Sequence, residues 1–131
     1  MRPCLVLLAA ASLAFAPAPF AKRESNEKDL KLLQGTWVGP GTLVARFERN
    51  TLSYYRDGKL VCTYRITLNA SAQPKAMDLV GISDARRCYD VIYDLHGDVL
   101  KTSGNGSHEP RPAAFEGKGK GRDLEILQRK K

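Results

Sequence analysis

Few side chains in this sequence have the types and spacing that chemistry needs. His96 lies in a tight turn, and His108 lies beside Glu109 in a stretch rich in glycine and proline. Neither histidine has a second ligand at the spacing of a metal site, so no metal is expected. Asp90 and Asp94 share the outer face of an expected strand, a setting more typical of solvated carboxylates than of an acid–base pair. Since no serine lies in a Gly-x-Ser-x-Gly sequence either, we expect no catalytic residue, no cofactor and no enzymatic activity.

Tyrosines are the polar side chains that the sequence directs inward most consistently. Tyr54, Tyr64, Tyr89 and Tyr93 fall on the apolar faces of their expected strands. Their rings can simply fill the core, because a small eight-stranded barrel is just wide enough to be packed by its own side chains. Their hydroxyls, with Arg56 or Thr102, can equally line a cup for a small ligand at the barrel mouth, with Phe115 anchoring a long loop over it. Both interpretations are open from the sequence.

Cys62 and Cys88 are the cysteines that follow residue 21. Cys62 shares the inward face of its strand with Tyr64, whereas Cys88 is out of phase with Tyr89 and is expected to point outward. Side chains on opposite faces of a sheet cannot reach the short Cβ separation of a disulfide. The sequence therefore favours two free thiols, unless a bulge near Arg87 reverses the phase.

The first 21 residues resemble a cleaved secretory signal peptide. Arg2 gives a positive start, and residues 5–16 (LVLLAAASLAFA) form an apolar run too short to span a bilayer. Small residues follow, which favours cleavage near Ala21 over an uncleaved anchor. We expect an exported protein, in the periplasm, at the cell surface or outside the cell. Residues 22–131 should form one domain that has no membrane span.

Alternating apolar and polar residues predict an all-β domain after one short helix. Residues 25–33 (SNEKDLKLL) have helical spacing and a cap at Ser25 or Asn26. Residues 59–69 (KLVCTYRITLN) alternate almost perfectly, which is typical of a half-buried antiparallel strand. Similar runs elsewhere bring the total to about eight short strands. Consecutive hairpins of this kind usually close into an antiparallel up-and-down barrel.

Three tight turns set the expected registers. A two-residue loop at Arg49 and Asn50 places apolar residues opposite one another. A three-residue loop ending at a left-handed Gly58 pairs Tyr54 with Leu60, and a two-residue loop at His96 and Gly97 pairs Tyr93 with Leu100. The resulting inward set is Trp37, Phe47, Leu52, Tyr54, Leu60, Cys62, Tyr64, Ile66, Leu79, Val91, Tyr93, Leu100, Leu124 and Ile126.

Five segments, in order, resemble a large family of uncharacterised secreted planctomycete proteins with a lipocalin-like domain. They are residues 28–37 (KDLKLLQGTW), 72–79 (AQPKAMDL), 91–101 (VIYDLHGDVLK), 109–115 (EPRPAAF) and 124–130 (LEILQRK). The resemblance covers nearly all of residues 22–131 and implies a lipocalin-like barrel whose biochemical activity is unassigned. Two departures are the short opening hairpin around Pro40 and the absence of the family's cysteine, where this chain has Thr102 and Ser103.

The same resemblance implies how the barrel closes. Lipocalins open their first strand with Gly-x-Trp, which Gly35 and Trp37 match. In that fold the Trp packs against an Arg of the last strand, for which Arg129 is the candidate. Gly58 and Gly97 are the expected structural glycines of the turns.

Charge and composition narrow the partners. The net charge is +7, but the basic run at Lys118, Lys120 and Arg122 is interleaved with glycine instead of aromatic residues, so no nucleic acid is expected. The function that the sequence favours is non-enzymatic binding of a small apolar or amphipathic ligand inside the barrel, by analogy with the fold. The alternative is a structural or protein-interaction module with a fully packed barrel and no ligand.

Overall fold

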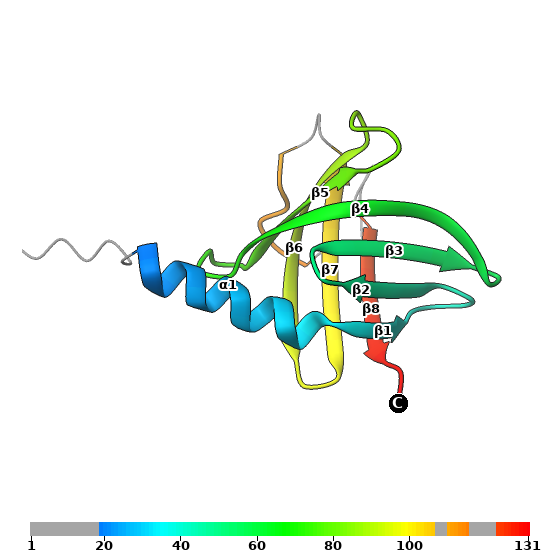
Figure 1. Cartoon of the computed structure of the whole chain (residues 1–131), viewed down its shortest axis with the longest axis horizontal. Helices are drawn as coiled ribbons and strands as arrows, with labels where there is room; N and C mark the ends of the chain where they lie inside the picture. The colour runs from blue at the N-terminus through cyan, green and yellow to red at the C-terminus, as the bar shows by residue number, and fades with distance from the viewer. Residues whose placement is uncertain (1–18, 107–109, 116–122) are drawn as a thin grey trace, which may run out of the picture.

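The computed structural model describes residues 19–106, 110–115 and 123–131 as one helix followed by an eight-stranded barrel (Figure 1). The elements are α1 (Pro19–Leu33), β1 (Gly35–Val38), β2 (Val44–Glu48), β3 (Thr51–Arg56), β4 (Lys59–Asn69), β5 (Ala76–Gly81), β6 (Cys88–His96), β7 (Val99–Gly106) and β8 (Asp123–Arg129). The predicted all-β, lipocalin-like fold is confirmed.

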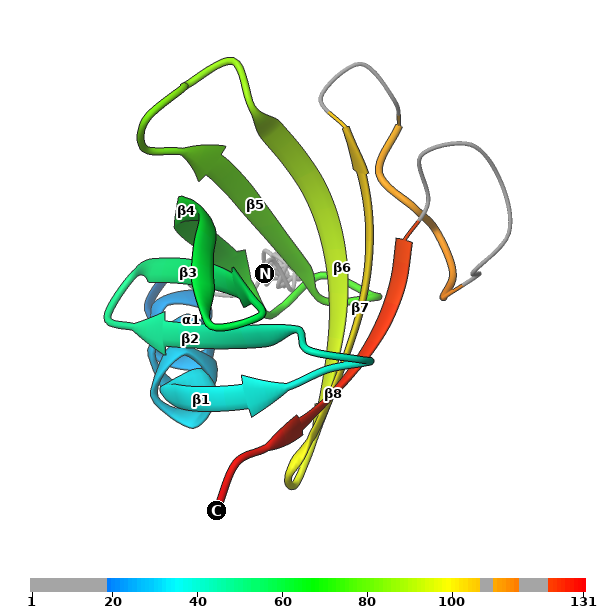
Figure 2. The same ribbon diagram turned by 90° about the vertical axis from the view of Figure 1, so that its right-hand side faces the viewer.

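Each strand pairs antiparallel with the next one in the sequence, and the sheet closes on itself. Closure occurs where β1 meets β8, with Trp37 opposite Arg129 and Val38 opposite Gln128. Figure 2 shows β1 and β8 side by side at this junction. The up-and-down order expected from the hairpins is therefore the order of the barrel.

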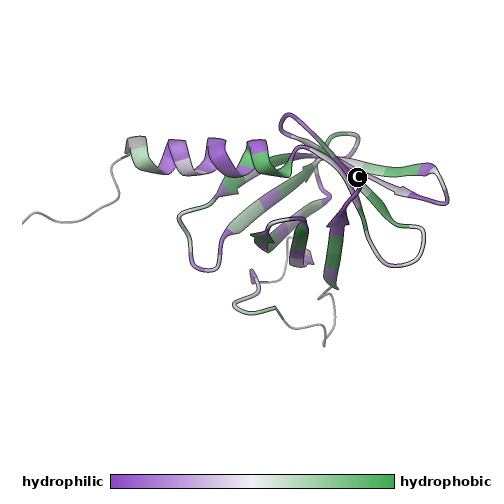
Figure 3. Ribbon diagram, turned by 90° about the horizontal axis from the view of Figure 1, so that it is seen from below, coloured by the Kyte–Doolittle hydropathy of each residue, from purple (hydrophilic) through white to green (hydrophobic). Residues whose placement is uncertain are grey.

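Helix α1 covers one end of the barrel. It begins at Pro19, earlier than the expected start at Ser25, so neither Ser25 nor Asn26 caps it. Asn26 Oδ1 instead accepts a hydrogen bond from the backbone N–H of Ala70 (2.8 Å) in the β4–β5 connection. Most of α1 is hydrophilic, with apolar residues at its C-terminal end (Figure 3), where Leu33 enters the core. Helix α1 therefore adds a lid to the barrel without adding a second core.

The expected signal peptide falls almost wholly outside the described residues, with only residues 19–21 inside α1. No helix of the described chain combines the length and apolar character needed to cross a bilayer.

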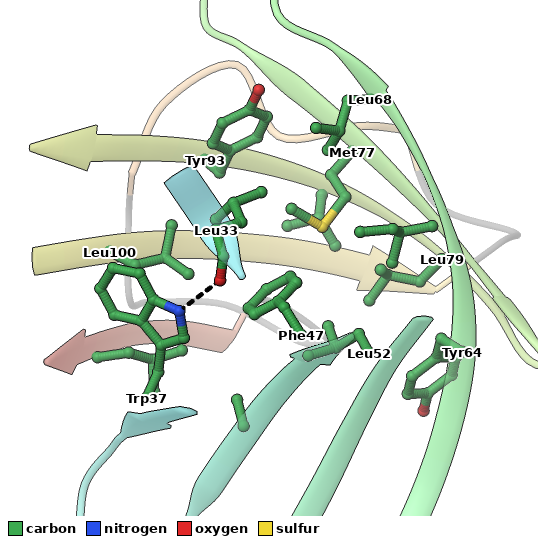
Figure 4. Close-up of a cluster of buried hydrophobic side chains, with 14 of the residues drawn as sticks. Leu33, Trp37, Phe47, Leu52, Tyr64, Leu68, Met77, Leu79, Tyr93 and Leu100 are labelled. Atoms are coloured by element: carbon green, nitrogen blue, oxygen red, sulfur yellow. Dashed lines mark hydrogen bonds between the residues drawn. The ribbon is translucent and has the colours of Figure 1, made fainter. Parts of the chain in front are cut away.

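The core fills the barrel between α1 and the middle of the strands. Figure 4 shows its largest members, and the indole Nε1 of Trp37 donates a hydrogen bond to the carbonyl of Leu33 (2.8 Å). Most of the predicted inward set is buried here. The buried apolar cluster comprises Leu33, Trp37, Leu43, Ala45, Phe47, Leu52, Tyr64, Ile66, Leu68, Met77, Leu79, Val91, Tyr93, Leu100 and Leu127.

The inward placement of Leu124 and Ile126 is wrong. Both are exposed, and Leu127 is buried in their place. Residues 125, 127 and 129 face the interior because Arg129 pairs with the inward-facing Trp37, and alternate residues of a strand share a face.

Leu60 is also exposed, because the predicted loop before it is wrong. Asp57 and Gly58 form a two-residue turn, both with positive φ (51° and 76°), as a type I′ hairpin turn requires. Tyr55 pairs with Leu60 but Tyr54 pairs with Cys62, so Val61 is the extra residue of a β-bulge. The bulge restores the inward phase of Cys62 and Tyr64 and leaves Leu60 outside.

The first turn follows its prediction, and the last one does not. Glu48 pairs with Thr51 across Arg49 and Asn50, as expected. The β6–β7 turn is Gly97 and Asp98, so Tyr93 lies opposite Thr102 and not Leu100. The register differs from the prediction by two residues, which leaves every side chain on its predicted face.

Cys62 and Cys88 are free thiols. Cys62 faces the interior, and the Cys88 thiol donates to the carbonyl of Ala85 (3.0 Å) within the β5–β6 turn.

Candidate functional site

A cavity opens at the end of the barrel opposite α1. The β1–β2, β3–β4, β5–β6 and β7–β8 connections lie at this end (Figure 1). Its volume is about 200 Å³. We call it the cup. Its lining residues come from six strands and the β1–β2 connection: Leu43, Tyr54, Arg56, Val61, Cys62, Tyr64, Leu79, Tyr89, Val91, Thr102, Gly104 and Glu125.

Three of the predicted tyrosines form one wall of the cup. The Tyr54 and Tyr64 rings have centroids 6.1 Å apart at 78°, and the Tyr64 and Tyr89 rings 5.7 Å apart at 89°. Such edge-to-face packing suits the aromatic quadrupole and stiffens the rings beyond simple area burial. Tyr54 lies opposite Cys62, two residues before Tyr64 on β4, which brings the first two rings together. The wall is therefore apolar and pre-formed.

The cup also contains polar and charged groups. Burial raises the pKa of Tyr54 well above its usual range, and the charges of Glu125, Cys62 and Tyr64 add to the rise. Burial likewise raises the pKa of Tyr64, with a hydrogen bond to Cys62 as the next cause. Both phenols are therefore neutral at physiological pH and can donate or accept hydrogen bonds. Arg56 supplies a positive charge at the exposed mouth.

Glu125 and Gly104 are cup residues that the sequence reasoning missed. The available signal for Glu125 was the expected contact of Arg129 with the inward Trp37, since residues 125 and 129 share a face. Gly104 lies against Val91, whose Cγ2 would be 2.9 Å from a Cβ at that position. The absence of a side chain at residue 104 keeps this part of the cup open.

Tyr93 lies away from Tyr64, near the end covered by α1 (Figure 4), and it is not among the residues that line the cup. Its hydroxyl donates to Asp29 Oδ2 (2.7 Å), and Lys75 Nζ contacts the same oxygen at 2.8 Å. Burial, followed by this hydrogen bond and the charge of Asp29, raises the pKa of Tyr93. Tyr93 thus holds α1 on the barrel and does not line the cup.

Phe115 lies on the outer face of the barrel, where Lys101 Nζ is 5.5 Å from its ring centroid. It belongs to residues 110–115, which we call the outer segment. A second hollow, of about 480 Å³, lies between this segment and the β4–β5 connection. In the described chain Phe115 lines neither hollow. The β7–β8 connection nevertheless starts and ends at the cup end of the barrel, as expected.

Arg111 fastens the outer segment to the sheet. Its guanidinium contacts Asp78 and lies 3.6 Å from Asp90, and its Nη1 donates to the carbonyl oxygens of Met77 (3.2 Å) and Val91 (2.9 Å). Asp78 and Asp90 face each other across β5 and β6. Asp90 is therefore part of an ion-pair cluster and not simply a solvated carboxylate, while Asp94 is exposed.

The expected structural residues lie where the barrel closes and turns. Arg129 Cζ is 4.3 Å from the Trp37 ring centroid, which confirms the predicted contact. Its guanidinium also donates to the carbonyls of Gln34 (2.9 Å) and Leu32 and to Asp98 (3.2 Å). Gly35, Gly58 and Gly97 all have positive φ, which glycine adopts without strain.

The remaining candidates give no site within the described residues. These residues contain no group of three or more His, Cys, Asp or Glu side chains that could hold a metal ion. His96 is exposed at the end of β6, whereas His108, Lys118, Lys120 and Arg122 lie outside the described residues.

No family model matches this chain, and neither the curated proteins nor the solved structures give a significant match. The resemblance to the planctomycete family therefore stays a prediction. The structure shows, over the described residues, a closed, eight-stranded antiparallel barrel with one N-terminal helix.

Proposed function

We propose that this protein is an exported, non-enzymatic barrel that binds a small amphipathic ligand in the cup. The observation that carries the proposal is the cavity beside Tyr54, Tyr64 and Tyr89. Its wall offers ring faces and edges for an apolar body and neutral hydroxyls for one or two hydrogen bonds.

The volume sets the size of the ligand. An engineered cavity of about 150 Å³ is known to accept benzene, and pockets for drug-sized ligands begin near 300 Å³. At about 200 Å³ the cup therefore suits a molecule of one or two rings, or a short branched chain. A long acyl chain would have to extend past the mouth.

The chemistry of the cup supports binding over catalysis. General acid–base work favours a group whose pKa lies near neutrality, and the pKa values of Tyr54 and Tyr64 are driven the other way by burial. Export is supported by the sequence of residues 1–21 alone, whose positive start and apolar run are typical of a signal peptide.

The experiment is a calorimetric titration of residues 22–131 with 1-naphthol, a two-ring phenol. We expect saturable binding of one molecule per chain. Tyr54→Leu should weaken it at least tenfold, because the hydroxyl and half of the edge-to-face pair are lost.

The matched control is Tyr55→Leu, at the neighbouring residue on the opposite face of β3. It should change naphthol affinity less than twofold. If neither naphthol nor a larger dye such as ANS binds the folded protein, the ligand-binding proposal fails and the packed interaction module is preferred.

A further inference from the structure

The mouth of the cup lies between two turns that carry unusually exposed apolar side chains. Leu60 and Val61, next to the β3–β4 turn, are 58% and 53% exposed. Ile82, in the β5–β6 turn, is 52% exposed. Figures 1 and 2 show both turns on the side of the barrel away from α1.

The same two turns carry most of their charge as cations. Arg56 and Lys59 flank the first turn, and Arg86 and Arg87 lie in the second; all four are exposed. Asp57 and Asp84 are the acidic residues of these turns. The Asp84 carboxylate accepts from the Arg86 backbone (3.1 Å) and contacts the Arg86 guanidinium (3.2 Å), so these two opposite charges offset each other. Arg56, Lys59 and Arg87 then stand against Asp57, and the two turns remain cationic.

The strand geometry leaves the apolar residues uncovered. The β4–β5 register ends with Tyr64 opposite Gly81, followed by one further bond from Ile82 N–H to the Thr63 carbonyl (3.1 Å). Leu60 and Val61 therefore have β3 on one side, where Tyr55 pairs with Leu60, and extend past the end of β5 on the other side. The bulge at Val61 and the neighbouring Lys59 are features that discourage pairing with a foreign strand. The uncovered residues are thus poorly suited to bind another sheet edge.

We propose that this rim, made of Arg56, Lys59, Leu60, Val61, Ile82, Arg86 and Arg87, docks on an anionic phospholipid membrane. Apolar side chains flanked by Lys and Arg are the combination that inserts at the boundary between headgroups and acyl chains. Basic side chains near such a surface are drawn to its negative potential. The orientation places the mouth of the cup against the lipid, so that an amphipathic ligand could pass directly between membrane and cup. Docking does not depend on the cup being filled.

The test is co-sedimentation of residues 22–131 with vesicles of phosphatidylcholine, with and without phosphatidylglycerol. We expect binding to the vesicles that contain phosphatidylglycerol, and much weaker binding to phosphatidylcholine alone. Lys59→Gln combined with Arg87→Gln should weaken binding about 25-fold, at about fivefold for each basic residue. Leu60→Asp combined with Ile82→Asp should abolish it, since an acid replaces each inserted side chain.

The controls separate docking from general stickiness and from the ligand function. Val99→Asp with Lys28→Gln makes comparable changes near the β6–β7 turn and on α1, and should leave vesicle binding unchanged. None of the four rim residues that are altered lines the cup, so naphthol binding without vesicles should persist in all variants.

Three results would overturn the proposal. One is equal binding to both kinds of vesicle, and another is equal loss in the control variant. The third is a concentration-dependent dimer of the wild type that Leu60→Asp dissociates, which would assign the rim to a second copy of the chain. If the wild type binds the anionic vesicles but does not bind naphthol, only the ligand proposal is contradicted.

Discussion

Asp29 is a carboxylate almost removed from water, at 5% exposure, yet it has two strong partners. Lys75 supplies the opposite charge and Tyr93 a hydrogen bond, both to the same oxygen. A buried charge is tolerated only when it is paired in this way, and removing one partner costs more than the pair itself contributes. The three residues join α1, the β4–β5 connection and β6, so this small polar cluster decides whether the helix stays on the barrel.

Tyr93→Phe tests the cluster through its pH dependence. The pKa of Tyr93 is raised above its ordinary value of 10.0 by burial and by the hydrogen bond to Asp29, so the native state keeps a proton that the unfolded state loses above about pH 10. The stability that this provides is complete below pH 10 and falls as the pH rises toward the folded pKa. The variant should be about 1.5–3 kcal/mol less stable at neutral pH, because a hydrogen bond to a charged group is lost. It should also lose less further stability above pH 10, as measured by urea unfolding at several pH values.

Tyr55→Phe is the control for that series, because Tyr55 lies on the outer face of β3. An equal alkaline loss of stability in Tyr93→Phe and the wild type would contradict the role given to Tyr93.

At the scale of elements, the outer segment offsets a repulsion between two carboxylates of the sheet. Asp78 and Asp90 are directly opposite each other on β5 and β6, a placement in which like charges destabilise the pair. Arg111 lies between them and also bonds two backbone carbonyls. Ile92, an outward residue by its phase, is buried in the same region. The segment therefore acts as an additional layer over the outer face of β5 and β6.

Arg111→Ala should release this layer. We expect a loss of about 1–2 kcal/mol, since the ion pairs are partly exposed and the hydrogen bonds carry most of the effect. Chymotryptic cleavage after Phe115 should become faster, measured by mass spectrometry of timed digests. Asp90→Asn in the same background should recover part of the stability by removing the repulsion.

Arg65→Ala, at an exposed arginine of β4, is the control. Equal cleavage rates in Arg65→Ala and Arg111→Ala would contradict the anchoring role.

The alternation of apolar residues predicted the strands and their faces better than their registers. A shift of two residues leaves the apolar pattern unchanged, so the pattern could not distinguish Leu100 from Thr102 as the partner of Tyr93. The turn at Asp57 and Gly58 did carry the correct signal, since Asp-Gly is a preferred type I′ pair. The prediction rejected this two-residue turn because, without a bulge, it would have placed Tyr54 opposite Val61. The extra residue at Val61 restores the pairing of Tyr54 with Cys62.

At the scale of the whole molecule, about half of the cup could be predicted. Tyr54, Tyr64 and Tyr89 come together because strand order and inward phase were both readable in the sequence. Tyr93 and Phe115 do not join them. The distance of Tyr93 along the barrel axis depends on the register, and the position of Phe115 depends on an ion pair formed far away in the sequence, between Arg111 and Asp78. Alternation contains no information on either.

The barrel closes at the short pairing of β1 with β8, which we call the seam. Arg129→Ala tests how much the seam contributes to stability. Removing the guanidinium takes away the contact with Trp37 and the hydrogen bonds to the chain before β1, an expected loss of about 2 kcal/mol. Because only β1 and β8 are distant in sequence, we expect the seam to form after the folding transition state. The variant should then unfold roughly 30-fold faster and refold at nearly the wild-type rate. Stopped-flow measurements in urea would show this, and a matching slowdown of refolding would contradict it.

Arg129→Lys keeps the charge without the planar fork of the guanidinium. Its unfolding rate should fall between those of the wild type and Arg129→Ala.

The seam also determines when a growing chain can finish folding. Gln34 and Arg129, which bond each other across it, are 95 residues apart, whereas all the other strand pairs join neighbours in the sequence. Hairpins can therefore form one after another as the chain emerges, but β1 has no second partner until β8 has been synthesised. Until then the sheet has two free edges, which are the sites where a foreign strand can add. A chain that stops short of Arg129 should thus aggregate more readily than one that ends just beyond it, although the two differ by only a few residues.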